Sequence, residues 1–167
     1  PVRVADVVIT CNSPGEVAGW LAPVLEELKA ISPETRLSVF IPPCPFSSGG
    51  ELRVAASYNK ADAIYGPRSY LLYALARIRP RGFSPGRRGA VLFLGGDLYH
   101  ARLLKKRLSY PALAYTEGYA RYVDCFERFL VPDRDAYSKA RNRGVPAEKL
   151  EVVGNLMADS VKPRLEP

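Results

Sequence analysis

An aspartate placed directly after two glycines is the residue of this sequence best suited to acid–base chemistry. Asp97 follows the apolar run 90–94 and the pair Gly95-Gly96, at the expected end of a buried strand. Because glycines leave such a strand end uncovered, the carboxylate could act as a general base on a substrate hydroxyl, provided that burial disfavours its charged form. The same carboxylate could instead cap the helix that follows, and the residues favour both roles about equally.

The segment 12–20, Asn-Ser-Pro-Gly-Glu-Val-Ala-Gly-Trp, joins the expected end of the first strand to the start of a helix. Ser13 can be the N-cap of that helix, Pro14 suits its first position, and Glu16 can complete a capping box. A helix start is the simpler explanation of these residues. Such a turn also places backbone N–H groups and the positive end of a helix dipole where α/β proteins bind ligands.

Two glycines in the same segment favour the ligand-binding explanation. Gly15 and Gly19 are poor choices for a helix interior, and each permits the close approach of a ligand or a neighbouring strand. The spacing is not that of the dinucleotide fingerprint, and no Gly-Lys-Ser or Gly-Lys-Thr of a P-loop follows. The turn therefore predicts a binding site without indicating its ligand.

Polar residues follow two further expected strands, at Thr116-Glu117-Gly118 and at Gly154-Asn155. Since the carboxyl ends of parallel strands meet at one edge of a sheet, we expect all these residues at one rim. His100, the single histidine, could pair with Asp97, although a lone histidine is more often a bystander. One histidine and three scattered cysteines do not supply a usual transition-metal set, so we expect neither a metal nor another cofactor.

The order of the elements indicates an α/β fold. Apolar runs of strand type alternate with segments of helical spacing. The strands are expected at 4–11, 37–41, 61–65, 90–94, 111–115, 128–131 and 150–153, and the helices at 21–28, 51–58, 68–78, 99–108 and 133–143. This alternation predicts right-handed crossovers and a Rossmann-like three-layer sandwich, a mostly parallel sheet with helices on both faces.

Length and composition fit one globular domain. The chain has 167 residues, of which 47% are hydrophobic and 25% charged. No apolar run approaches the roughly 20 residues of a membrane span, and the N-terminus lacks a secretion signal. Cys11, Cys44 and Cys125 indicate reduced thiols in a cytoplasmic protein. Pro1 indicates a processed or engineered start, and the last five residues look like a cut end.

Positive charge is concentrated in one stretch. Between residues 67 and 110 there are ten basic residues and one acid, so this stretch carries +9 while the rest of the chain carries −2. Interleaved aromatic and aliphatic residues favour a membrane interface over a nucleic-acid surface, and no nucleic-acid-binding motif appears. We expect contact with an anionic membrane, with Tyr70, Leu71 and Phe83 entering it, or with a substrate phosphate; a solvated face is the simpler alternative. The arginines concerned are Arg68, Arg77, Arg79, Arg81, Arg87 and Arg88.

Three motifs give the chain a resemblance to a known family. They are Ser-Pro-Gly-Glu-Val-Ala-Gly-Trp at 13–20, Leu-Gly-Gly-Asp at 94–97 and Val-Val-Gly-Asn-Leu-Met-Ala-Asp at 152–159. In their order and spacing the sequence resembles lipid-A-disaccharide synthases and their relatives. The resemblance covers essentially the whole chain and implies the N-terminal, acceptor-binding half of an inverting glycosyltransferase of the two-domain GT-B architecture.

The resemblance also implies roles for single residues. It makes Asp97 the base that deprotonates the acceptor hydroxyl, and it places Gly15 and Glu16 in the first substrate loop. Two segments depart from the family: Ala18-Gly19-Trp20 stands where the family has Ser-Gly-Asp, and Tyr99-His100 where it has Pro-Asp. We therefore expect a related but distinct branch.

The sequence thus predicts a Rossmann-like acceptor-binding domain at 1–155 and, at 156–167, the crossover to a missing donor-binding domain. The full protein would move a sugar from a nucleotide-sugar donor to a lipid-linked or glycan acceptor, in the cytoplasm or peripherally at the inner face of the membrane, and this chain alone would be inactive. The alternatives are a nucleotide-sugar 2-epimerase-like domain and a noncatalytic ligand- or membrane-binding module. The expected substrate-binding residues are Ser13, Gly15, Glu16, Gly19, Gly95, Gly96, Glu117 and Asn155.

Overall fold

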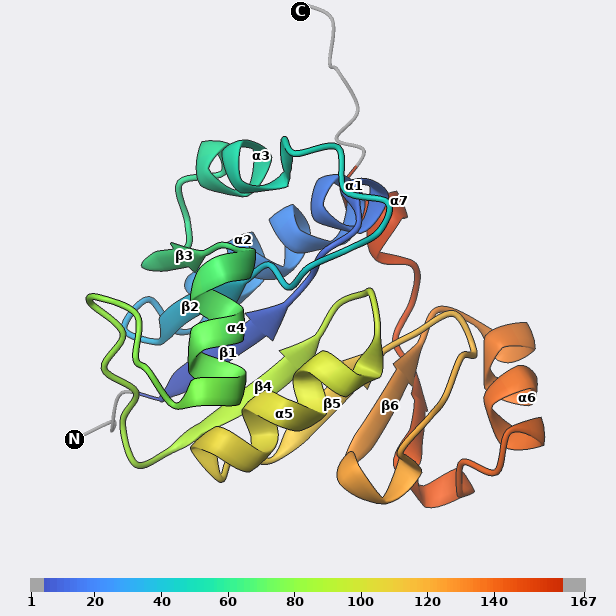
Figure 1. Cartoon of the computed structure of the whole chain (residues 1–167). Helices are drawn as coiled ribbons and strands as arrows, with labels where there is room; N and C mark the ends of the chain where they lie inside the picture. Colours follow the sequence, from blue (N-terminus) through green and yellow to red (C-terminus); the bar gives the residue numbers. More distant parts are fainter. Residues whose placement is uncertain (1–4, 161–167) are drawn as a thin grey trace, which may run out of the picture.

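A computed structural model of the chain describes residues 5–160 and contains one seven-stranded parallel sheet (Figure 1). The strand order is β3-β2-β1-β4-β5-β6-β7, and every neighbouring pair is parallel. The strands are β1 (Asp6–Thr10), β2 (Arg36–Phe40), β3 (Ala63–Tyr65), β4 (Gly89–Phe93), β5 (Ala112–Tyr115), β6 (Arg128–Val131) and β7 (Leu150–Val152). The predicted Rossmann-like α/β fold is confirmed.

The helices connect these strands as right-handed crossovers require. They are α1 (Pro14–Glu16), which continues into a π-helix (Val17–Leu21) and α2 (Ala22–Ile31), then α3 (Glu51–Ser57), α4 (Pro67–Ala76), α5 (Leu98–Leu108), α6 (Arg134–Asn142) and α7 (Leu156–Ser160). Among residues 5–160, none of these helices has the length and apolarity to cross a bilayer.

Two hydrophobic cores lie on opposite faces of the sheet, because successive strand side chains point in opposite directions. Val8 belongs to the core beneath α4, α5 and α6. Its neighbour Ile9 belongs to the core beneath the π-helix, α2 and α3. Figure 1 shows α4 and α5 side by side over one face of the sheet. The result is the three-layer sandwich that the sequence predicts.

The connection between β5 and β6 differs from the other crossovers. It contains one short 3-10 helix, Val123–Cys125, in place of an α-helix. The face of the sheet beside α5 is therefore covered by an irregular segment there, and a hollow opens between this segment and α5.

Two aromatic residues of the basic stretch have a structural role. Tyr70 and Phe83 are buried, at 1% and 6% exposure, and their rings contact Phe40 of β2 at centroid distances of 6.4 and 5.1 Å. The expectation that they enter a membrane interface is therefore wrong, since they anchor α4 and the loop after it to the sheet. Leu71, by contrast, is exposed.

Candidate functional site

The candidate site lies at the carboxyl ends of β1 and β4. These strands are neighbours, but the chain leaves β1 toward β2 and leaves β4 toward β5, so the two following loops diverge. This divergence is the topological switch point at which open α/β sheets bind ligands. The predicted meeting of polar strand ends at one rim is observed for three of the four strand ends.

Two adjoining hollows of about 430 and 220 Å³ occupy this rim. We call them together the rim cleft; both are lined by Glu16, Gly96 and Tyr119. The larger hollow is also lined by Asn12, Ser13, Pro43, Cys44, Pro45, Phe46, Asp97 and His100, and the smaller by Trp20, Phe93, Gly95, Tyr115, Thr116 and Glu117.

The loop after β1 forms the capping box that the sequence predicts, and its residues line the rim cleft. The Ser13 hydroxyl oxygen accepts a hydrogen bond from the Glu16 backbone N–H at 3.4 Å, and Glu16 Oε2 accepts one from the Ser13 N–H at 3.3 Å. The Glu16 carboxylate is thereby fixed at the mouth of the cleft. This geometry establishes the capping role of Glu16, which also lines both hollows of the rim cleft.

Gly95 and Gly96 are required by the two side chains that lie over them. Both have positive φ angles, 136° and 90°, which glycine adopts without strain. A methyl group at Gly95 would overlap the Glu16 carboxylate, and one at Gly96 would overlap the Asn12 side-chain amide. The glycine pair therefore allows Glu16 and Asn12 to approach the end of β4.

Asp97 has the capping role that the sequence offers as one of two alternatives. Its Oδ1 accepts a hydrogen bond from the Tyr99 N–H at 2.8 Å, at the N-terminus of α5. Its Oδ2 lies 3.7 Å from Arg121 Nη1, and 48% of its side chain is exposed. The burial on which a general-base role would depend is thus absent from this structure, although Asp97 does line the rim cleft.

His100 lies one turn along α5 and also faces the rim cleft. Its Nδ1 is 2.9 Å from the hydroxyl oxygen of Tyr70, and the two rings meet edge to face. Burial lowers the pKa of His100 below its ordinary value, while nearby Asp97 acts in the opposite direction. Burial also raises the pKa of Tyr70, so the pair favours neutral His100 beside neutral Tyr70.

Three buried polar atoms at the rim cleft have no hydrogen-bond partner among the described residues. They are Asn12 Oδ1, Trp20 Nε1 and Thr116 Oγ1, and their residues are between 3% and 7% exposed. A fourth such atom, Thr10 Oγ1, belongs to a residue that does not line the cleft. Buried polar groups are nearly always paired, and three of these four exceptions belong to residues that line the rim cleft. The sequence places Asn12 and Thr116 at strand ends, but nothing in it shows that their polar atoms would be buried without partners.

Three residues predicted for the site, Gly15, Gly19 and Asn155, do not line the rim cleft. Gly15 is exposed, with no atom within 4 Å of a methyl group placed there. Gly19 packs against α7, where such a methyl group would lie 3.0 Å from Met157 Cγ. Asn155 caps α7 by accepting a hydrogen bond from the Met157 N–H at 2.9 Å. Gly19 and Asn155 therefore serve the contact between the π-helix and α7 and do not line the rim cleft.

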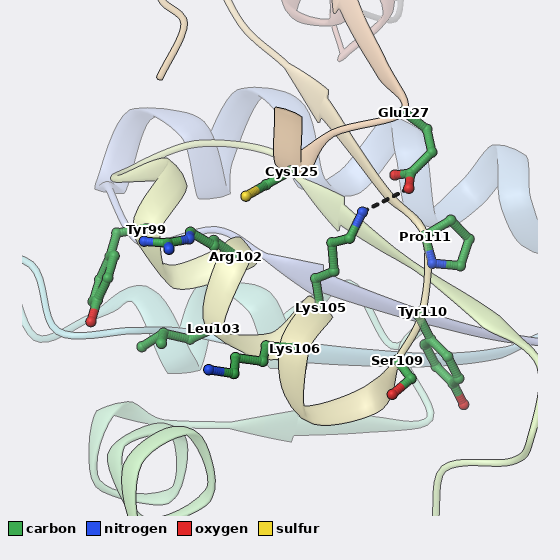
Figure 2. Close-up of a pocket in the computed structure, with 10 residues that line it drawn as sticks. All are labelled: Tyr99, Arg102, Leu103, Lys105, Lys106, Ser109, Tyr110, Pro111, Cys125 and Glu127. Atoms are coloured by element: carbon green, nitrogen blue, oxygen red, sulfur yellow. Dashed lines mark hydrogen bonds and ion pairs between the residues drawn. The ribbon is translucent and has the colours of Figure 1, made fainter. Parts of the chain in front are cut away.

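A larger hollow, of about 760 Å³, lies between α5 and the β5–β6 connection (Figure 2). Its walls carry Arg102, Lys105 and Lys106 from α5, and Lys105 reaches across to Glu127 in a 2.7 Å ion pair. It is not lined by Asp97 or His100. The strand-end polar groups instead converge on the rim cleft. Nowhere in residues 5–160 do three His, Cys, Asp or Glu side chains gather in a group that could hold a metal ion.

The comparisons with known proteins show the fold. Neither a known family profile nor a curated sequence matches the chain. In structure it is similar to the UDP-GlcNAc 2-epimerase from Neisseria meningitidis bound to UDP-GlcNAc, with 18% identity and a TM-score of 0.64 over 93% of this chain and 47% of that chain. A second UDP-N-acetylglucosamine 2-epimerase has 15% identity, a TM-score of 0.61, and 95% and 50% coverage. S. aureus MnaA with UDP has 13% identity, a TM-score of 0.63, and 98% and 50% coverage.

The chain thus spans about half the length of these structures, and at such identities the likeness shows a GT-B-like Rossmann fold alone. None of the three is a lipid-A-disaccharide synthase. The expectation of an acceptor-binding half of an inverting glycosyltransferase is therefore corrected: the structural neighbours are UDP-GlcNAc 2-epimerases, which favours the alternative of a nucleotide-sugar 2-epimerase-like domain.

Proposed function

We propose that this chain is one half of a two-domain protein of the nucleotide-sugar 2-epimerase type, and that its rim cleft binds the nucleotide sugar. The observation that carries the proposal is the set of three buried, unpartnered polar atoms of Asn12, Trp20 and Thr116 at the topological switch point. Two of the neighbouring structures contain UDP-GlcNAc or UDP, which supports this class of ligand.

The three orphan atoms suit the hydroxyl and amide groups of a sugar. Asn12 Oδ1 can accept a hydrogen bond, Trp20 Nε1 can donate one, and the Thr116 hydroxyl can do either. A buried group that gains a partner from a ligand no longer carries its desolvation penalty, so each contact should add affinity. Pro43–Phe46, after β2, lines the outer side of the larger hollow, and its exposed Phe46 offers an apolar surface to a sugar ring or a base.

Inversion at carbon 2 of a sugar requires groups that can remove and return a proton at the ring. Glu16, Asp97, His100 and Glu117 line the rim cleft and are the acid–base groups of this chain available for that step. On α5, Asp97 caps the helix through one oxygen and lies 3.7 Å from Arg121 through the other, while His100 contacts the Tyr70 hydroxyl through Nδ1. Of these two residues, the second ring nitrogen of His100 is the position left for proton transfer. In the complete protein, the nucleotide would be shared with the second half.

The single tryptophan supplies a test, because Trp20 lies in the rim cleft and reports on ligand binding through its fluorescence. UDP-GlcNAc is expected to change that fluorescence in a saturable way. Thr116→Val replaces the orphan hydroxyl by a methyl group of similar size and is expected to weaken binding by about tenfold, or about 1.4 kcal/mol, within the usual range for one hydrogen bond. The same variant should keep or raise the unfolding midpoint, since it removes an unsatisfied buried group.

A matched control is Ser138→Ala, which removes an exposed hydroxyl on α6, away from the rim cleft, and should leave binding unchanged. No fluorescence response to UDP-GlcNAc, or an unchanged affinity in Thr116→Val, would overturn the proposed site. Assay of the complete protein by NMR for the carbon-2 epimer of UDP-GlcNAc then separates an epimerase from a noncatalytic binding module.

A further inference from the structure

A strongly basic hollow lies between the C-terminal ends of α4 and α5. It measures about 300 Å³ and is lined by Arg77, Arg79, Lys106, Arg107 and the buried ring of Tyr73. No acidic side chain lines it, and within residues 5–160 none of its four cations forms an ion pair with a carboxylate. Arg107 is held in place by donating to the Ala74 and Leu75 carbonyl oxygens at 2.7 and 2.9 Å. We call this hollow the basic pocket.

Arg77 occupies a backbone position that would suit glycine better. It ends α4 with φ at +62°, in the left-handed region, where a side chain other than glycine costs about 1 kcal/mol. An arginine at this position places a guanidinium at the mouth of the basic pocket. Replacement by glycine should therefore remove a cation and relieve strain at the same time, which separates a loss of binding from a loss of folding.

Apolar side chains are exposed directly beside the basic pocket. Leu71, Leu72 and Leu75 lie on the outer face of α4, and Ile78 follows its end; Leu75 is 59% exposed and Ile78 is 55% exposed. Residues 71, 72 and 75 follow the helical spacing of one face. Arg68 in the first turn of α4, and Arg81, Arg87 and Arg88 in the loop between α4 and β4, are also exposed. The result is an apolar helix face bordered by cations, which we call the α4 face.

We propose that the α4 face and the basic pocket together dock this protein on an anionic phospholipid bilayer, with a lipid phosphate in the basic pocket and the leucines in the acyl boundary. Cations without acids would also suit a soluble phosphate compound, but such a ligand leaves four exposed aliphatic side chains unexplained. A lipid explains both, because its charged headgroup and apolar chains lie next to each other. This inference goes beyond the proposed function and does not depend on it.

The position of the basic pocket is compatible with an open rim cleft during docking. α4 and α5 run antiparallel to the strands, so their C-terminal ends lie at the edge of the sheet where strands begin. The rim cleft lies at the opposite edge, where β1 and β4 end. Figure 1 shows α4 and α5 on the outer surface of the sheet, with nothing stacked over them.

Vesicle co-sedimentation of the 167-residue chain tests the proposal. The chain is expected to bind vesicles of phosphatidylcholine mixed with phosphatidylglycerol at low salt, to bind pure phosphatidylcholine vesicles much less, and to dissociate as salt shortens the Debye length to about 8 Å. Arg77→Gly should weaken partitioning by about fivefold, the effect of about 1 kcal/mol per basic residue near an anionic surface, with an unchanged or higher unfolding midpoint. Leu75→Ser should weaken it several-fold, although it alters no charge.

Arg53→Gln is the matched control, since it removes one exposed positive charge from α3 over the other face of the sheet and should change partitioning by less than about twofold. Equal binding to both vesicle types, or no binding to anionic vesicles at low salt, would overturn the proposal. So would wild-type binding by Arg77→Gly and Leu75→Ser, which would indicate attraction by bulk charge. Binding of inorganic phosphate, lost in Arg77→Gly, together with no vesicle binding would assign the pocket to a soluble anion instead.

Discussion

At the residue scale, the side chains at the rim cleft divide into those that shape it and those left for a ligand. Ser13 and Glu16 are engaged with each other, and Asp97 holds the first turn of α5. Asn12, Trp20 and Thr116 are buried with a polar atom unused. The residues that best match a family motif are therefore the structural ones, and those with free bonding capacity lie beside them.

Replacement of Gly96 should measure how much the close packing at the end of β4 contributes to stability. Gly96→Ala places a methyl group onto the Asn12 side chain and forces a left-handed backbone on a residue that avoids it. Together these effects should lower the free energy of unfolding by about 1–3 kcal/mol, measured by urea denaturation. Gly15→Ala, where the added methyl group meets nothing, is the control and should be neutral or slightly stabilising. Equal losses in both variants would show that backbone strain and contact at Gly96 do not matter.

At the element scale, the sequence determines the order and type of the elements but not their irregularities. Apolar runs and helical spacing predict every strand and five α-helices, because these periods report burial directly. The start of α6 is fixed by a cap, since Asp133 accepts a hydrogen bond from the Ala136 N–H at 2.8 Å. The π-helix at Val17–Leu21 and α7 were not predicted. The two elements pack against each other where Met157 lies over Gly19, a contact between distant segments that no local pattern contains.

The same limit explains the misassigned aromatics and site residues. In the sequence, Tyr70 and Phe83 stand among arginines, which is typical of a membrane interface. In the structure they are buried because their rings pack against Phe40 of β2. Asn155 follows a strand, as the other rim residues do, yet it lies at the end of edge strand β7, away from the switch point. Strand order decides which strand ends meet, and strand order is a property of the whole sheet.

At the edge of the sheet opposite the rim cleft, the Asp6 side chain of β1 is hydrogen-bonded to β2 and to the segments that precede β4 and β5. Its carboxylate accepts hydrogen bonds from Arg36 Nε of β2 at 2.6 Å, from the Tyr110 hydroxyl at 3.0 Å and from the Gly86 N–H. Burial alone would raise the pKa of Asp6, but these three donors and the charge of Arg36 outweigh it and lower the pKa below 3.8. The folded state therefore favours the charged carboxylate.

This pKa shift predicts a pH-dependent contribution to stability. Because the folded pKa is depressed, the unfolded chain binds the proton more readily, so the stabilisation is present above about pH 4 and is lost as the pH falls through the folded pKa. Asp6→Asn should cost about 1–3 kcal/mol at pH 7, and the difference from wild type should narrow below pH 4. Urea denaturation at both pH values measures this. A difference that does not change with pH would mean that hydrogen-bond geometry, and not charge, provides the stability.

At the scale of the whole molecule, the sheet separates two hydrophobic cores, and the two candidate binding surfaces lie at its opposite edges. The rim cleft lies at the carboxyl edge of the strands, and the basic pocket lies at the amino edge, joined by the lengths of α4 and α5. This separation would allow the two proposed ligands, a nucleotide sugar and a bilayer, to be bound without competition. It also follows directly from the crossover topology, since a helix that returns the chain to the start of a strand must end far from the rim.

The two cores should unfold together. Strand residues alternate between them, as Val8 and Ile9 do, so neither core can lose its packing without the sheet that the other also needs. Trp20, the single tryptophan, lies in the core beneath α2 and α3, together with Tyr115. Four buried tyrosines, Tyr65, Tyr70, Tyr73 and Tyr110, lie in the other core and dominate the buried tyrosine signal. We expect Trp20 fluorescence, tyrosine near-ultraviolet circular dichroism and far-ultraviolet circular dichroism to give one coincident transition in urea, with equal calorimetric and van't Hoff enthalpies. A fluorescence transition at lower urea than the tyrosine signal would instead show that the face carrying the π-helix, α2 and α3 opens separately, and the rim cleft would then be coupled to that local opening.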